Sequence, residues 1–270
     1  MKKYRLVTLY SGSEGNSTFV SSGKASILID AGKSARTLCA RLAEIGSDIQ
    51  NISAIFITHE HTDHVSALET LSKKYHIPIH ITDASAKKFD RTPNAAVHSC
   101  LIRHDTVFCQ TVGDITVRSF PTPHDSMMSV GYRISFEADG EKHVLGVATD
   151  IGHVSAEIRE GLMGAEAIVL ESNHDEQMLI SGPYPRELKA RILSERGHLS
   201  NRDSSELAAC LARGGCKGFI LAHLSRENNE PRLAFDVAVN EIADRSVRVC
   251  VAPPDAPCEL CFDFAEETVW

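Results

Sequence analysis

Three histidines and an aspartate lie within six residues of this chain, in the run His59-Glu60-His61-Thr62-Asp63-His64. The run follows the apolar segment 54–58, which predicts a buried strand, and it precedes 65–71, whose apolar spacing predicts a helix. His59 and His61 flank Glu60, so their rings can face one point, while Asp63 and His64 begin the helix and can face a second. Imidazoles and a carboxylate at this density predict a site for two metal ions a few ångströms apart.

Such a site needs more ligands than this run supplies, and three candidates lie at the ends of apolar strands further along the chain. They are His124, Asp150 and His223. Open α/β architectures collect functional side chains at strand ends. Each residue alone is as well explained as a loop or surface residue, but together with the first run they predict a shared metal site.

The composition is that of an acidic globular protein. Of 270 residues, 43% are hydrophobic and 24% are charged, and 28 basic against 36 acidic residues give a net charge of −8. This balance argues against a broad nucleic-acid-binding surface, which is usually basic. Bound divalent cations would nevertheless create a local positive well for a phosphodiester.

No segment approaches the ~20 apolar residues of a membrane span, and the basic N-terminus lacks the apolar core and cleavage site of a signal peptide. We therefore expect a cytoplasmic protein that does not enter a membrane. Its eight cysteines show no framework spacing, so reduced thiols are expected. The lone CxxC pair, Cys258 and Cys261, is too little to predict a zinc knuckle.

Strand and helix signals alternate along the whole chain. Strands are predicted at 4–10, 18–20, 25–30, 54–58, 77–81, 167–170, 219–222 and 247–251, hairpins at 107–120 and 130–149, and helices at 34–45, 65–71, 155–163, 185–195, 203–213 and 231–244. Strand clusters separated by helices in both halves predict an α/β (α+β) fold, a four-layer αββα sandwich, although the pattern alone leaves other layered folds open. We expect one domain over 1–270, with a short extension from about residue 253.

Two polar segments are open to two interpretations each. The loop 11–17 has two glycines, three serines and an asparagine, which suit a phosphate cradle and an ordinary turn equally well. The stretch 185–202 is rich in basic residues, which would contact phosphates or form a solvated helix face. These basic residues are Arg186, Lys189, Arg191, Arg196 and Arg202.

These motifs resemble a known family. The run 58–64 is similar to the HxHxDH signature of metallo-β-lactamase-fold hydrolases, and the order His cluster, His124, Asp150, His223 matches their successive metal motifs. Further segments resemble the YycJ/WalJ/VicX group of bacterial metal-dependent DNA exonucleases, over roughly residues 5–250 and with no departure at the metal positions. These segments are 11–17, 123–132, 149–152, 171–175, 197–201 and 222–229.

The resemblance implies a metallo-β-lactamase fold with two divalent metal ions, for which Mn²⁺, Zn²⁺ and Fe all suit the ligands. One ion would be held by His59, His61 and His124, the other by Asp63, His64 and His223, and Asp150 would bridge the two together with a water or hydroxide.

The resemblance also implies catalytic and substrate-binding residues. Asp63 would orient the bridging hydroxide as nucleophile. His198 resembles a substrate-facing histidine that binds the phosphate or protonates the leaving oxygen, although it is also explained as a residue just before the helix 203–213. Glu171 would orient His198. Substrate contacts are expected from Ser13, Asn16, His198, Ser200 and Asn201.

We therefore expect a metal-dependent phosphodiesterase acting on DNA, an exonuclease that uses a metal-bridging hydroxide. A phosphodiesterase for RNA or a small cyclic phosphate is left open by the acidic pI. A non-catalytic metal-binding regulator is disfavoured because the ligand set is complete. A homo-oligomer is left open. The remaining histidines, including His80 and His104, are expected to be structural or surface residues.

Overall fold

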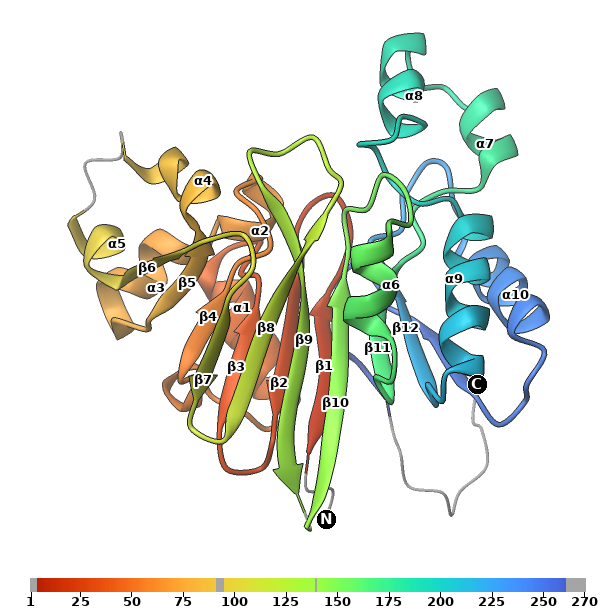
Figure 1. Cartoon of the computed structure of the whole chain (residues 1–270). Helices are drawn as coiled ribbons and strands as arrows, with labels where there is room; N and C mark the ends of the chain where they lie inside the picture. The colour runs from red at the N-terminus through yellow and green to blue at the C-terminus, as the bar shows by residue number, and fades with distance from the viewer. Residues whose placement is uncertain (1–3, 91–94, 139, 261–270) are drawn as a thin grey trace.

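Two seven-stranded sheets pack face to face, with helices on their outer faces (Figure 1). This computed structural model describes residues 4–90, 95–138 and 140–260. The arrangement confirms the predicted four-layer αββα sandwich.

The first sheet comes from the N-terminal half of the chain plus one strand from the C-terminal part. Its order is β14 (Cys258–Glu259), β1 (Arg5–Tyr10), β2 (Ser17–Ser21), β3 (Ser26–Ile29), β4 (Ala54–Phe56), β5 (Ile79–Thr82) and β6 (Leu101–His104). Pairing is antiparallel from β14 to β3 and parallel from β3 to β6.

The second sheet repeats this pattern with strands from residues 109–251. Its order is β13 (Arg248–Val251), β12 (Gly218–Ala222), β11 (Ala167–Glu171), β10 (Glu141–Ala148), β9 (Ser129–Ala138), β8 (Ile115–Thr122) and β7 (Cys109–Val112). Pairing is parallel from β13 to β10 and antiparallel from β10 to β7.

Helices flank both sheets. The first sheet is accompanied by α1 (Ala35–Glu44), α2 (Thr62–Val65), α3 (Leu68–Tyr75), α4 (Asp83–Ala86), α5 (Ala95–Cys100) and the 3-10 turns η1 (Ile49–Asn51) and η2 (Lys87–Phe89). The second is accompanied by α6 (Ala156–Leu162), α9 (Asn201–Arg213) and α10 (Pro231–Ile242). The short helices α7 (Glu176–Ser181) and α8 (Arg186–Ile192) project beyond the sandwich, at the top of Figure 1.

Strand alternation divides the interior into three apolar layers. Along β3, Leu28 faces the outer helices, while Ile27 and Ile29 face the other sheet. Along β11, Ile168 faces the outer helices and Val169 faces inward. Because both faces of each sheet are covered, the central strands are apolar throughout, as parallel strands of layered folds usually are.

Three predictions about elements need correction. The helix expected at 65–71 is interrupted, and its residues belong to α2 and α3. Ala31 N donates to His64 O and Ala31 O accepts from Ala67 N, so the backbone of Ala31 takes the place of helical hydrogen bonds where the two helices meet. The segment 83–104 carries short helices and β6 that the periodicity did not predict. The segment after residue 253 is not only an extension, since β14 pairs with β1.

Two further expectations concerned the CxxC pair and membrane-spanning segments. Cys261 of the CxxC pair lies outside the described residues. Among the helices that the structure describes, none combines the length and apolarity required to cross a bilayer.

Candidate metal centre

Ligand-type residues from both sheets meet at one rim of the sandwich, where parallel strands end. His59 follows β4, His124 follows β8, Asp150 follows β10 and His223 follows β12, while Asp63 and His64 lie in α2. Asp150 and His223 each have a φ of 58°, in the left-handed region that side-chain-bearing residues rarely adopt. Such backbone strain persists at functional sites when the surrounding structure holds it in place.

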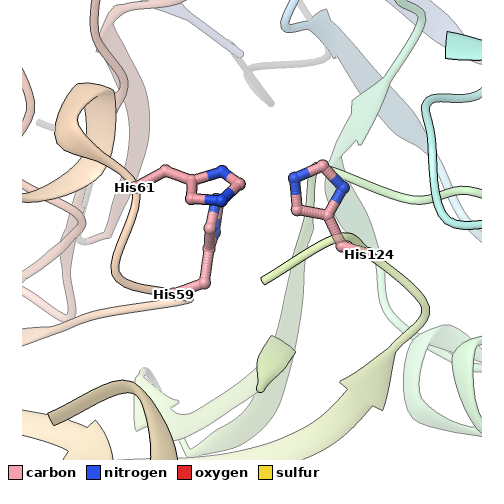
Figure 2. A group of neighbouring side chains, drawn as sticks. All are labelled: His59, His61 and His124. Carbon is pink, nitrogen blue, oxygen red and sulfur yellow. The ribbon is translucent and has the colours of Figure 1, made fainter. Parts of the chain in front are cut away.

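One group of imidazoles lies between the two sheets at this rim. Figure 2 shows His59 and His61, from the loop after β4, facing His124 from the opposite side. One ring nitrogen from each lies within 4.8 Å of the others. Three nitrogens at this spacing can share a single cation.

A second group lies beside the first. Asp63, His64 and His223 also offer ligand atoms within 4.8 Å of one another. Asp150 faces both groups, because its carboxylate lies 3.3 Å from His64 Nε2, 3.6 Å from His223 Nε2 and 3.7 Å from His124 Nε2. All seven sequence-predicted ligands therefore converge at this rim.

The protein fixes four of these rings through Nδ1. His64 Nδ1 donates to Asp30 at 2.8 Å, His223 Nδ1 to Glu171 at 2.8 Å and His124 Nδ1 to Gly197 O at 3.1 Å. His59 Nδ1 lies 3.0 Å from Thr58 Oγ1. A histidine ligand usually donates its other ring nitrogen in this way, which orients Nε2 toward the metal.

Within the described part of the chain, three buried polar atoms at the centre of the cluster have no hydrogen-bond partner. They are His59 Nε2, His223 Nε2 and Asp150 Oδ2. Buried polar atoms are rarely left unpaired, because the lost hydration is costly. Nitrogen and carboxylate donors that are unpaired and share one centre fit divalent metal ions.

The electrostatics of the cluster favour ionised carboxylates and a neutral His59. Burial alone would raise the pKa of Asp150, but the His223 and His64 imidazoles outweigh it and hold the pKa well below its ordinary value. The pKa of Asp63 is likewise low, since His64 and His223 outweigh its burial. Burial lowers the pKa of His59, which leaves its nitrogen available as a ligand.

Glu171, at the end of β11, connects the cluster to His198. Its Oε1 accepts from both His198 Nδ1 and His223 Nδ1 at 2.8 Å, and its Oε2 accepts from the backbone of Ile151 and Leu199. Burial would raise the pKa of Glu171, but His198 and His223 lower it to about 2. One buried carboxylate therefore orients a predicted ligand and the half-buried His198 together.

The loop 11–17 contacts the second group through Asn16 and Ser11. Asn16 Nδ2 lies 3.2 Å from both Asp63 Oδ2 and His64 Nε2, and Asn16 N donates to Asp63 O. Ser11 Oγ accepts from the backbone of His223 at 2.7 Å. Ser13 is exposed in the same loop. The buried Asn16 side chain thus contacts the predicted ligands themselves.

Ser200 and Asn201, two of the expected substrate contacts, make hydrogen bonds within the protein. Ser200 caps α9 by accepting from Asp203 N. Asn201 is buried, accepts from Ser172 Oγ at 2.7 Å and donates to Asn229 Oδ1 at 2.8 Å. Because these polar atoms are paired within the protein, the two side chains position the loop that carries His198.

Two functional positions escaped the sequence reasoning. Asp30, at the end of β3, accepts from His64 Nδ1 and from Thr58, and it carries the same signal as Asp150, a carboxylate directly after an apolar strand. Gly32 lies so close to the ligand loop that an added Cβ would be 1.8 Å from Asp63 O. A glycine is therefore required here for close backbone approach.

The basic stretch 185–202 is largely engaged within the protein. Arg196 donates to the carbonyls of His124 and Ser126, at 2.9 and 3.2 Å, and Arg191 pairs with Asp125. Lys189 donates to Ile180 O in α7 and to Gly182 O just after it. These side chains hold the projecting helices and the loop after His124, so few of the charges form a free phosphate-binding face.

Comparison with known proteins identifies relatives over most of the chain. A family model described as the beta-lactamase superfamily domain matches residues 25–224. Exodeoxyribonuclease WalJ of Streptococcus pneumoniae is 34% identical over 250 residues, which are 92% of this chain and 91% of that protein. Exodeoxyribonuclease YycJ of Bacillus anthracis is 37% identical over 233 residues, 84% of each chain.

Solved structures show the same fold at low sequence identity. The metallo-β-lactamase fold protein YhfI of Bacillus subtilis has a TM-score of 0.70 at 16% identity, covering 96% of this chain and 100% of that one. A diphosphatase of the PhnP family has a TM-score of 0.66 at 15% identity, covering 95% and 97%. The chain has the metallo-β-lactamase fold and belongs to the β-lactamase superfamily and, within it, to the family of WalJ and YycJ.

Proposed function

We propose that this protein is a DNA exonuclease that hydrolyses phosphodiester bonds with two divalent metal ions. The observation that carries the proposal is the convergence of seven ligand-type side chains, with unpaired Nε2 and carboxylate atoms at their centre. The two relatives named exodeoxyribonucleases, each similar over at least 84% of its length, support DNA as the substrate.

The ligands divide between the two ions as the contacts suggest. His59, His61 and His124 would hold one ion, Asp63, His64 and His223 the other, with Asp150 between them. Bound divalent cations supply a water of lowered pKa and neutralise phosphate oxygens. Mn²⁺, Zn²⁺ and Fe all suit this mixture of nitrogen and oxygen donors.

Asp63 and His198 are placed to orient the water, bind the substrate and transfer protons. The carboxylate of Asp63 is half-buried and ionised, so it can accept a hydrogen bond from the attacking water and orient it. His198 is held through Nδ1 by Glu171, which leaves Nε2 for a phosphate oxygen or for the leaving 3′- or 5′-oxygen. A general acid at this position is worth roughly 10²–10⁴-fold in rate.

An end-labelled linear duplex incubated over a panel of divalent metals tests this function. We expect progressive release of label from an end and loss of this activity in Asp150→Asn. Asp114→Asn is the control and should have normal activity, because the Asp114 carboxylate lies in a hairpin turn, where it accepts a hydrogen bond from Ser22. Cleavage of bis(4-nitrophenyl) phosphate without cleavage of DNA would favour a small phosphodiester substrate. Inertness toward both with every metal would favour a non-catalytic metal-binding protein.

A further inference from the structure

Two cysteines meet where the edges of the two sheets come together, away from the metal ligands. Cys250 lies on β13, the edge strand of the second sheet, and Cys258 on β14, the edge strand of the first. Their Sγ atoms are 3.3 Å apart, within hydrogen-bonding distance. We propose that Cys250 and Cys258 form a reversible dithiol–disulfide site that links the two sheets covalently.

The backbone around both thiols is already fixed by strand pairing. Cys250 is in register with Ile220 of β12, and Cys258 with Thr8 of β1. Between them, Ala252 N donates to Leu221 O at 2.8 Å. A disulfide needs its sulfurs about 2.05 Å apart, so closure requires a movement of only about 1.3 Å from the present contact.

The environment of the pair suits thiol–disulfide exchange. Both side chains are half-buried at the margin of the apolar layer between the sheets, which leaves them partly accessible to a small oxidant. A hydrogen bond from the Cys250 S–H to the Cys258 sulfur stabilises the Cys258 thiolate and lowers the pKa of that thiol, which increases its thiolate fraction.

The oxidant is a low-molecular-weight disulfide such as oxidised glutathione. The Cys258 thiolate attacks one sulfur of that disulfide, and the other sulfur leaves as a thiolate. The Cys250 thiolate then attacks Cys258 Sγ and releases the second small thiolate. The two cysteine protons end on the two released thiols, so one disulfide is reduced while one is formed.

The link would restrain a strap, residues 251–257, that lies against the rim of the metal centre. Lys33 Nζ donates to Pro254 O at 2.7 Å, and Asp255 pairs with both Lys33 and Arg226. Arg226 in turn pairs with Glu14, in the loop that carries Asn16, at 2.8 Å. Oxidation would therefore stabilise the connection between the sheet edges and the loop 11–17.

Equilibration of the intact protein with oxidised and reduced glutathione, followed by mass spectrometry and peptide mapping, tests the site. We expect the protein to lose two hydrogen atoms, with Cys250 linked to Cys258, and to regain them with dithiothreitol. Cys250→Ser and Cys258→Ser should form no internal link, whereas Cys109→Ser, at an exposed cysteine, should behave as the wild type.

Thermal unfolding supplies a second readout that does not depend on metal or DNA. The oxidised wild type should unfold at a temperature higher by roughly 5 °C or more, and neither variant of the pair should show this shift. A link mapped to any other pair of cysteines, thiols that persist in excess oxidised glutathione, or an oxidised form less stable than the reduced one would overturn the proposal.

Discussion

The side-chain amide of Asn16 donates to Oδ2 of Asp63 at 3.2 Å, while the backbone N–H of Asn16 donates to Asp63 O at 2.8 Å. Two hydrogen bonds from one residue therefore fix both the backbone and the carboxylate of a predicted ligand. The amide is itself fixed, since its Oδ1 accepts from Gly12 N and its Nδ2 donates to Gly12 O. The loop 11–17 thus positions a predicted metal ligand, whether or not it also contacts the substrate.

Asn16→Ala should lower kcat and the affinity for divalent metal by about 10–100-fold, the usual cost of losing a partner of a metal ligand. KM for DNA should change little, because the amide is buried against Asp63 and His64. Steady-state kinetics and calorimetric metal titration measure the two effects. Asp114→Asn, at a residue that bonds Ser22 away from the cluster, is the control. A rise in KM alone for Asn16→Ala would instead support substrate binding by this residue.

Glu171→Gln should weaken metal binding and reduce kcat by about 10–100-fold, because one carboxylate orients both His223 and His198. Glu166→Gln is a matched control, since Glu166 makes a similar contact of 2.8 Å with His143 away from the cluster. Metal titration and kinetics on both variants distinguish the roles. Equal, small effects at the two positions would show that Glu171 is only a structural partner.

The convergence of the candidate ligands could be predicted from the sequence because they follow a local rule. His124, Asp150 and His223 each lie within two residues of the end of a strand, and strands that run the same way bring such ends to one rim. The partners of these ligands follow no local rule. Asn16 and Asp63 are 47 positions apart and Glu171 and His223 are 52, so only the folded chain shows which residues meet.

The errors in the predicted elements have a similar origin. The helix after His64 is interrupted by the backbone of Ala31, a residue more than thirty positions earlier. The strand β14 is two residues long and has no periodicity to detect, so its pairing with β1 is defined only by the sheet edge. The hydrogen bonds of Asn201 to Ser172 and Asn229, which lie 29 and 28 positions away, likewise follow no local pattern.

The buried His80 should make the protein less stable in acid. Burial, and then the neighbouring His104, lower the pKa of His80 from 6.5 to about 4, so the unfolded chain binds a proton that the folded protein does not. This stabilisation is complete above the unfolded pKa of 6.5 and is lost as the pH falls toward about 4.

His80→Phe keeps a ring to stack on Phe56 and removes the titration. Between about pH 7 and about pH 5, the wild type should lose roughly 2 kcal/mol more unfolding free energy than this variant. Urea unfolding of both proteins at the two pH values, with the same metal content, measures the difference. Parallel losses in the two proteins would show that His80 does not contribute.

The central claim is that the seven side chains at the rim hold a pair of divalent cations. The most direct measurement is elemental analysis of the metal-loaded protein, combined with anomalous diffraction to locate the ions. We predict two ions per chain, one near His59, His61 and His124 and one near Asp63, His64 and His223, with the occupancy of both reduced in Asp150→Asn. A protein that binds no metal at saturating concentrations, or binds it only away from these residues, would contradict the account.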